Sequence, residues 1–230
     1  MTGPQLKAER EKKGWTQETV ADLLRVSQSY LSQLEKGNRR VTERMARAAA
    51  ELYETSPVLL PLRSSPDTVG CSDSNRLAGE LAALGYPGFS YLRESQPPKN
   101  PAEVLFSALQ TNDLDSRLTE ALPWVVLTFP GLDWQWLVSA AKLRDLQNRL
   151  GFVTTVARRL AESEGDLSKT ALLREKEELL ERSRLARQDT LCHDSLTPAE
   201  RRWLLENRPD EARHWELLTD LSPEHLSYAA

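Results

Sequence analysis

Two short runs of apolar residues near the start of the chain recur at the spacing of a helix. Val20, Ala21 and Leu24 form the first run. Leu31 and Leu34 belong to the second. Only a few residues separate the two runs, which is enough for a tight turn and too little for a longer connection. The pattern therefore predicts two short helices around a turn.

Both predicted helices begin behind a hydroxyl side chain. Thr16 and Ser27 can each accept a hydrogen bond from an unpaired N–H of the first turn, and Gly37 is suited to end the second helix in a left-handed conformation. The face of the second helix opposite its leucines carries amides and hydroxyls: Gln28, Ser29, Ser32 and Gln33. Such side chains can hydrogen-bond to base edges, so the pattern predicts a helix-turn-helix whose second helix reads DNA.

The run at 17–37 reads Q-x-x-V-A-x-x-x-x-V-S-x-S-Y-L-S-x-L-E-K-G. It resembles the helix-turn-helix of the lambdoid phage repressors and Cro proteins, and the likeness covers about residues 3–56. The resemblance implies a five-helix domain in which Gln17 donates to a phosphate and Gln28 lies in the major groove. Glu35 would be a structural acid near the end of the reading helix. Ser29, Ser32 and Gln33 would lie beside Gln28.

The chain departs from this family at Arg25, because the residue before Val26 is usually glycine. A positive φ at this position would cost a residue with a side chain on the order of 1 kcal/mol. That cost is tolerable, and a cationic side chain helps near DNA. The prediction of a helix-turn-helix therefore stands.

Positive charge is concentrated at the start of the chain. Residues 1–56 hold ten Lys and Arg against eight acids, in a chain whose net charge is −4. Lys36, Arg39 and Arg40 follow the predicted reading helix and are expected to contact phosphates. For the two arginines the alternative is a solvated loop. A mildly basic beginning on an acidic remainder suits a DNA reader joined to a part with another role.

The remainder of the chain is long enough for a second domain. Helical periodicity dominates it, and no period-two strands with hairpin turns appear, so the fold class is predicted to be all-α: a repressor-like domain followed by a larger helical bundle. One long apolar pattern covers 133–163, with Gly151 as a candidate break. The expected division is a helix-turn-helix domain at 1–62, a linker and short helical segment at 63–100, and a helical domain at 101–230.

Two segments allow two interpretations each. The apolar stretch 56–62 is expected to form a fifth helical turn that closes the small core, and the alternative is a dimer contact. The charged segment 166–188 is expected to form a helix that lays one apolar edge on its own bundle. Its Leu172, Leu179 and Ala186 repeat at seven residues, so the alternative is a contact with a partner or a second copy.

No catalytic or metal-binding pattern emerges from the sequence. Cys71 and Cys192 are too few for a disulfide framework, and Cys192–His193–Asp194 is only one corner of a site. The chain contains three histidines, no zinc-ligand spacing and no glycine-rich phosphate loop. We therefore expect no enzyme activity, no metal and no cofactor. A signal peptide, an apolar spanning run and a lipidation motif are also lacking, so a cytoplasmic protein without membrane association is expected.

These features lead to a sequence-specific repressor that binds a palindromic operator in double-stranded DNA as a homodimer. Gln28 and Gln33 are the expected base contacts, and Gln17, Lys36, Arg39 and Arg40 the expected phosphate contacts. The large helical remainder suggests a protein partner, so the favoured hypothesis is an autoregulating antitoxin that neutralises a toxin. The alternative is a stand-alone or small-ligand-responsive regulator, and an enzyme fused to a reader is the weakest interpretation.

Overall fold

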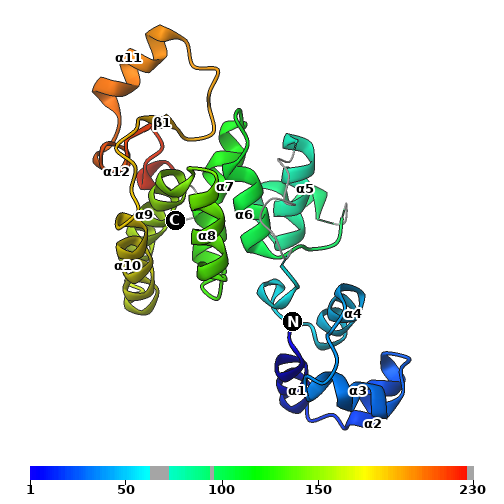
Figure 1. Cartoon of the computed structure of the whole chain (residues 1–230). Coiled ribbons are helices and arrows are strands. Elements are labelled where there is room, and N and C mark those ends of the chain that lie inside the picture. The colour runs from blue at the N-terminus through cyan, green and yellow to red at the C-terminus, as the bar shows by residue number, and fades with distance from the viewer. Residues whose placement is uncertain (63–72, 94–95, 227–230) are drawn as a thin grey trace. The chain divides into compact units, whose positions relative to one another are not determined.

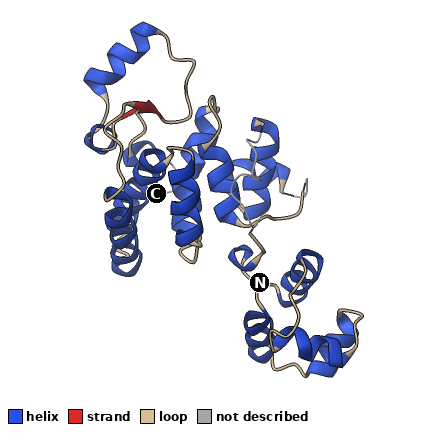
Figure 2. Ribbon diagram, viewed as in Figure 1, coloured by secondary structure: helices blue, strands red, loops and turns tan. Residues whose placement is uncertain are grey.

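Helices make up nearly all of the regular structure in the part of the chain that the computed structural model describes (Figures 1 and 2). The described residues are 1–62, 73–93 and 96–226. The all-α class predicted from the sequence is confirmed. The chain divides into two compact units, Met1–Leu62 and Arg63–Ala230.

Short capped helices build the first unit. Thr16 accepts a hydrogen bond from the Thr19 amide at 3.1 Å, and Ser27 accepts one from the Tyr30 amide at 3.2 Å. The core between the helices includes Leu31 and other side chains with almost no exposure to solvent. The elements are α1 (Gly3–Lys12), α2 (Gln17–Leu23), α3 (Gln28–Glu35), α4 (Glu43–Tyr53) and η1 (Pro57–Leu59), a 3₁₀ turn in the segment where a fifth helical turn was expected.

The turn between α2 and α3 contains a residue in the left-handed conformation, at the position where the family resemblance implied one. Arg25 has φ of 54°. Its amide donates to the Asp22 carbonyl at 3.1 Å, and the next amide, of Val26, donates to the Ala21 carbonyl at 2.9 Å. These bonds close the end of α2 and set the direction in which α3 leaves.

The second unit is centred on two buried helices. All nine residues of α6 (Pro101–Leu109) are buried, and thirteen residues of α9 (Gln147–Ser163) are buried. The helices α5 (Ser74–Leu84), α7 (Ser116–Thr128) and α8 (Trp134–Leu143) pack against α6, while α10 (Leu167–Glu181) and α7 pack against α9. Smaller elements complete the unit: η3 (Pro87–Leu92), β1 (Asp189–Thr190), α11 (Pro198–Asn207), α12 (Asp210–His214), β2 (Leu217–Leu218) and η4 (Pro223–His225).

The segment 63–100, expected to be a linker and a short helix, is partly described. Residues 63–72, which carry most of the predicted linker, lie outside the described residues, and so do 94–95. The expected short helix is present as α5, which buries seven of its residues and packs on α6 and α7. The described part of this segment is therefore integrated into the second unit.

The predicted break of the long apolar pattern at Gly151 is wrong. The chain breaks instead at Asp145, which has φ of 57°, and α9 runs through Gly151 without interruption. The glycine accommodates an indole ring: a Cβ at Gly151 would lie 2.4 Å from the ring of Trp215. That ring is fully buried, and its Nε1 donates to the Thr155 hydroxyl at 2.8 Å.

Two further details differ from the sequence-based expectation. The charged helix ends at Glu181, and its buried edge is Leu173 and Leu180, while Leu179 is 37% exposed. As expected, the helix packs one apolar edge against its own bundle. That edge is formed by Leu173 and Leu180, however, and not by the repeat that includes Leu172. In addition, β1 and β2 pair in parallel over two residues each, a contact too short to leave a pattern in the sequence.

Candidate nucleic-acid interface

The second helix of the predicted helix-turn-helix, α3, separates its apolar and polar residues. Leu31, Leu34 and Glu35 face inward and are buried. On the outer face Gln28, Ser29 and Gln33 are exposed, while Ser32 is half-buried. An exposed amidic face on a helix held by a small core has the form that can enter a major groove.

A buried carboxylate ties this helix to the two before it. Glu35 accepts hydrogen bonds from Arg10 Nε at 2.7 Å and Arg10 Nη2 at 3.0 Å, so the guanidinium of this α1 residue binds both oxygens of the carboxylate. The Glu35 side chain is only 1% exposed. Arg10 also donates to the Trp15 carbonyl at 2.8 Å, which fixes the loop before α2. Glu35 is thus the structural acid that the family resemblance implied.

The position of Gln17 adds a detail to its predicted phosphate contact. Its Nε2 donates to Glu35 Oε2 at 2.8 Å, so the amide is oriented by the same carboxylate. An amide nitrogen carries two hydrogens, and one bond to Glu35 leaves the other available for a phosphate oxygen. The side chain is half-buried at the start of α2.

Electrostatics follow from this geometry. Burial by itself would raise the pKa of Glu35, but the hydrogen bonds from Arg10 and Gln17 outweigh it and lower the pKa below its usual value. The same bond raises the pKa of Arg10. Burial, with the Glu35 charge nearby, raises the pKa of Tyr53 to about 12. The network is therefore an ion pair at neutral pH.

A shallow hollow of about 260 Å³ lies on the outer face of α3. The Arg39 guanidinium stands 5.5 Å from the centre of the Tyr30 ring, in a cation–π contact that brings the loop after α3 back over the helix. Ser27, Ser29 and Gln33 complete the lining. The structure thus brings Ser29, Gln33 and Arg39 together.

Sequence reasoning missed two members of this surface. Tyr30 received no role, and Ser27 was assigned only as a cap. The available signal was helical spacing, because Tyr30 lies three residues from both Ser27 and Gln33. The remaining predicted contacts, Lys36 and Arg40, are exposed around the same loop.

The run Cys192–His193–Asp194 in the second unit has a structural role. The Cys192 thiol is buried beside the Ala108 carbonyl, and burial raises its pKa to about 12, so it stays protonated at neutral pH. Arg149 secures this loop through Asp189 at 2.8 Å and Asp194 at 3.4 Å. Nowhere in the described residues do three His, Cys, Asp or Glu side chains gather in a way that could hold a metal ion. No described helix has the length and apolar character that a membrane crossing needs.

Comparison with known proteins bears on the first unit alone. Neither a curated protein nor a solved structure matches the chain. A family model described as a helix-turn-helix domain matches residues 3–62. The matched range ends where the first compact unit ends, at Leu62, and it contains the whole network that positions α3. The first unit is a helix-turn-helix DNA-binding domain.

Proposed function

We propose that the chain is a sequence-specific transcriptional repressor that reads its operator with α3. The observation that carries the proposal is the exposed face of Gln28, Ser29 and Gln33 on a helix whose inner face is held by the buried Arg10–Glu35 pair. A preorganised reading surface is solvent-exposed and held in position before DNA binds; α3 is exposed on this face and is anchored on the other through the buried Arg10–Glu35 pair.

The proposed base contacts are Gln28 and Gln33. A glutamine amide can form paired hydrogen bonds with the N6 and N7 atoms of adenine, and each good pair discriminates against a wrong base by about 1–3 kcal/mol. Ser29 and Ser32 would make supporting contacts beside them. We therefore expect adenine at the positions in each half-site that face these two glutamines.

Phosphate contacts would come from Gln17, Lys36, Arg39 and Arg40. The three cations follow α3 or lie in the loop after it, and all are exposed. Each neutralised phosphate releases counterions, so the logarithm of the binding constant should fall with log salt by about 0.9 per phosphate contact. Replacing Arg40 with glutamine should reduce this slope by about one without changing the preferred sequence.

Repression would be dimeric in this proposal. Two copies of α3 on one face of DNA need half-sites about 34–36 Å apart, one helical turn, and the operator would be a palindrome. The test is selection of binding sites from a random duplex pool with the full chain. A two-fold symmetric motif with that spacing is expected. Failure to enrich any motif would contradict sequence-specific binding.

A second candidate function is the autoregulating antitoxin, which gives the second unit a protein partner. Its support is α11, a helix at one edge of the second unit in Figure 1 that buries only Leu204. Trp203 and Leu205 on this helix are 54% and 44% exposed. Large apolar side chains exposed on one helix are common at protein interfaces.

The antitoxin proposal can be tested with the neighbouring gene of the native host. The expected result is that this gene arrests growth when expressed alone and that co-expression of the chain restores growth. Trp203→Ala should weaken the rescue, while Gln28→Ala, a change in the DNA reader, should leave it intact. A neighbouring gene without toxicity, or rescue that is insensitive to Trp203, would contradict the proposal.

A further inference from the structure

Arg39 lies against the outer face of α3, although it belongs to the loop that follows this helix. Its backbone amide donates to the Gln33 carbonyl at 3.2 Å, which fastens the loop to the last turn of α3. From there the side chain extends back toward the start of the helix, because its guanidinium lies 5.5 Å from the centre of the Tyr30 ring. Tyr30 is half-buried and packs against the core of the domain. The guanidinium therefore rests on an aromatic surface that the core holds in place.

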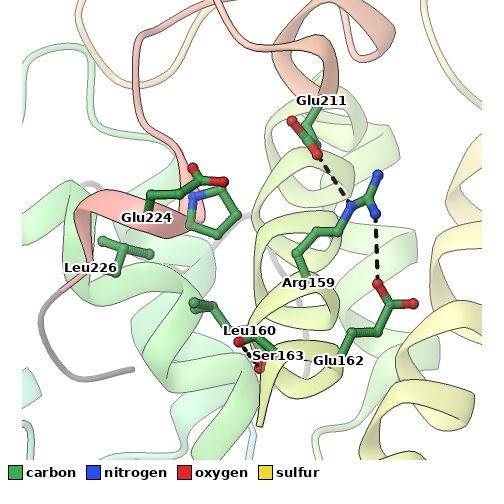
Figure 3. Close-up of a pocket in the computed structure, with 8 residues that line it drawn as sticks. Arg159, Leu160, Glu162, Ser163, Glu211, Glu224 and Leu226 are labelled. Atoms are coloured by element: carbon green, nitrogen blue, oxygen red, sulfur yellow. Dashed lines mark hydrogen bonds and ion pairs between the residues drawn. The ribbon is translucent and has the colours of Figure 1, made fainter. Parts of the chain in front are cut away.

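The Arg39 guanidinium is exposed and has no anionic partner within the part of the chain that the structure describes. Arg159, which lines a hollow of about 700 Å³ in the second unit, shows the opposite arrangement (Figure 3). Its guanidinium lies 3.2 Å from a carboxylate oxygen of Glu211 and 3.7 Å from one of Glu162, contacts drawn as dashed lines in Figure 3. An anion at Arg159 would have to displace these carboxylates, whereas an anion at Arg39 meets no such competitor.

Tyr30 and Glu35 lie on opposite borders of the buried face of α3. At about 100° per residue, the five positions between them correspond to about 140° around the helix axis, with the buried leucines in between. Gln17 is bound to Glu35 at 2.8 Å, and Arg39 stacks on Tyr30. These two proposed phosphate contacts therefore flank the exposed face of α3 from opposite sides. A helix in the major groove has one DNA strand along each of its sides, so the two side chains are placed to reach different strands.

We propose that Tyr30 is a positioning residue for DNA binding: its ring holds the Arg39 guanidinium where it binds a phosphate on the strand opposite to the one that Gln17 contacts. This inference rests on the proposed function, because it deepens the phosphate contact of Arg39. A guanidinium that is already in place loses less side-chain freedom when it binds. Its planar fork can then donate two parallel N–H···O bonds to one phosphate. Tyr30 acts through Arg39 and needs no phosphate contact of its own.

The first test is a double-mutant cycle on the full chain, with duplex binding measured by fluorescence anisotropy. Tyr30→Leu keeps an apolar side chain against the core and removes the ring. It should weaken binding about two- to fivefold, which is the contribution of a cation–π contact at an exposed site, and it should have no effect in the Arg39→Gln background. Tyr30→Phe, which keeps the ring, should bind as the natural chain does. Arg40→Gln is the matched control, because Arg40 is an exposed neighbour in the same loop; in its background Tyr30→Leu should keep its full effect.

The second test identifies the phosphates with operator duplexes that carry a single neutral methylphosphonate. At the phosphate that Arg39 binds, neutralisation should weaken the natural chain and leave Arg39→Gln unaffected, with a reduced effect on Tyr30→Leu. The phosphate that becomes insensitive in Gln17→Ala should lie on the other strand. If both phosphates lie on one strand, the proposal is wrong.

Equal effects of Tyr30→Leu with and without Arg39 would also overturn the proposal, because they would reveal a structural role alone. If Tyr30→Leu lowers the urea midpoint of the domain, Tyr30→Met replaces it in the cycle. Every duplex contains phosphates, so the cycle is repeated on a scrambled duplex. Coupling there without any selected motif would contradict sequence-specific repression and support this inference, whereas a selected motif without coupling would overturn this inference alone. Failure to bind any duplex would overturn both.

Discussion

Replacing Glu35 with glutamine removes the carboxylate that joins three helices of the DNA-binding domain. Arg10 comes from α1, Gln17 from α2 and Glu35 from α3, and both oxygens of the carboxylate are in use. Glutamine offers one acceptor oxygen in place of two, and its amide nitrogen would face a donor. The variant therefore leaves the Arg10 charge buried without its counterion.

The magnitude follows from the burial of the pair. The side chains of Arg10 and Glu35 are 10% and 1% exposed, and removing one partner of such a pair costs about 3–5 kcal/mol. Natural domains have about 0.05–0.15 kcal/mol of stability per residue, which gives about 3–9 kcal/mol for a unit spanning Met1–Leu62. We expect Glu35→Gln to bring this unit close to its unfolding transition at 25 °C.

The assay is urea unfolding of a fragment covering residues 1–62, followed by the fluorescence of Trp15, its only tryptophan. The indole reports on the core because its ring lies 5.9 Å from that of Tyr53. Glu11→Gln is the matched control: this acid also lies near Arg10, at 3.5 Å, but is 54% exposed. Its loss should cost at most about 1 kcal/mol.

The hydrogen bonds to Glu35 also predict how the free energy of unfolding of the first unit changes at acid pH. Because the folded pKa of Glu35 lies below its ordinary value of 4.5, its contribution is complete above that value and is lost as the pH falls through the lowered pKa. The Glu35→Gln fragment should lack this part of the pH dependence. Equal unfolding midpoints for Glu35→Gln and Glu11→Gln, or the same acid limb with and without Glu35, would refute the reasoning.

One position in each unit tests whether the backbone there requires the conformation or the space that the structure shows. Arg25→Gly should be about 1 kcal/mol more stable than Arg25→Ala in urea unfolding, since only glycine relieves the left-handed φ of 54°; equal stability would contradict this. Gly151→Ala should destabilise the second unit by about 1–3 kcal/mol in thermal unfolding, because the new methyl would overlap the Trp215 ring. An increase in Tm, which glycine-to-alanine changes inside helices ordinarily produce, would show that the ring is not held there.

The features that could be predicted from the sequence are those set by neighbouring residues. Thr16 and Ser27 cap helices within their own first turns, and Leu31 and Leu34 face one core, so the location and exposed face of α3 follow from local spacing. The left-handed Arg25 was anticipated from a single difference with a known family. These features decide where the proposed DNA-binding surface lies.

The features that could not be predicted depend on residues distant along the chain. Nothing near Gly151 indicates that an indole from residue 215 will fill its place. Leu172 and Leu173 both recur seven residues later, and only packing on α9 selects the edge that contains Leu173. The orientation of Gln17 likewise depends on a carboxylate eighteen residues away.

The most direct test of the central claim is a comparison of selected operator and scrambled duplex, measured by fluorescence anisotropy for the natural chain, Gln28→Ala, Gln33→Ala and the control Gln135→Ala. Gln135 is exposed on α8 in the second unit. The account predicts that each α3 variant loses about 1–3 kcal/mol of preference for the operator while scrambled binding and the control remain unchanged. Undiminished preference in both α3 variants would contradict the assignment of α3 as the reading helix.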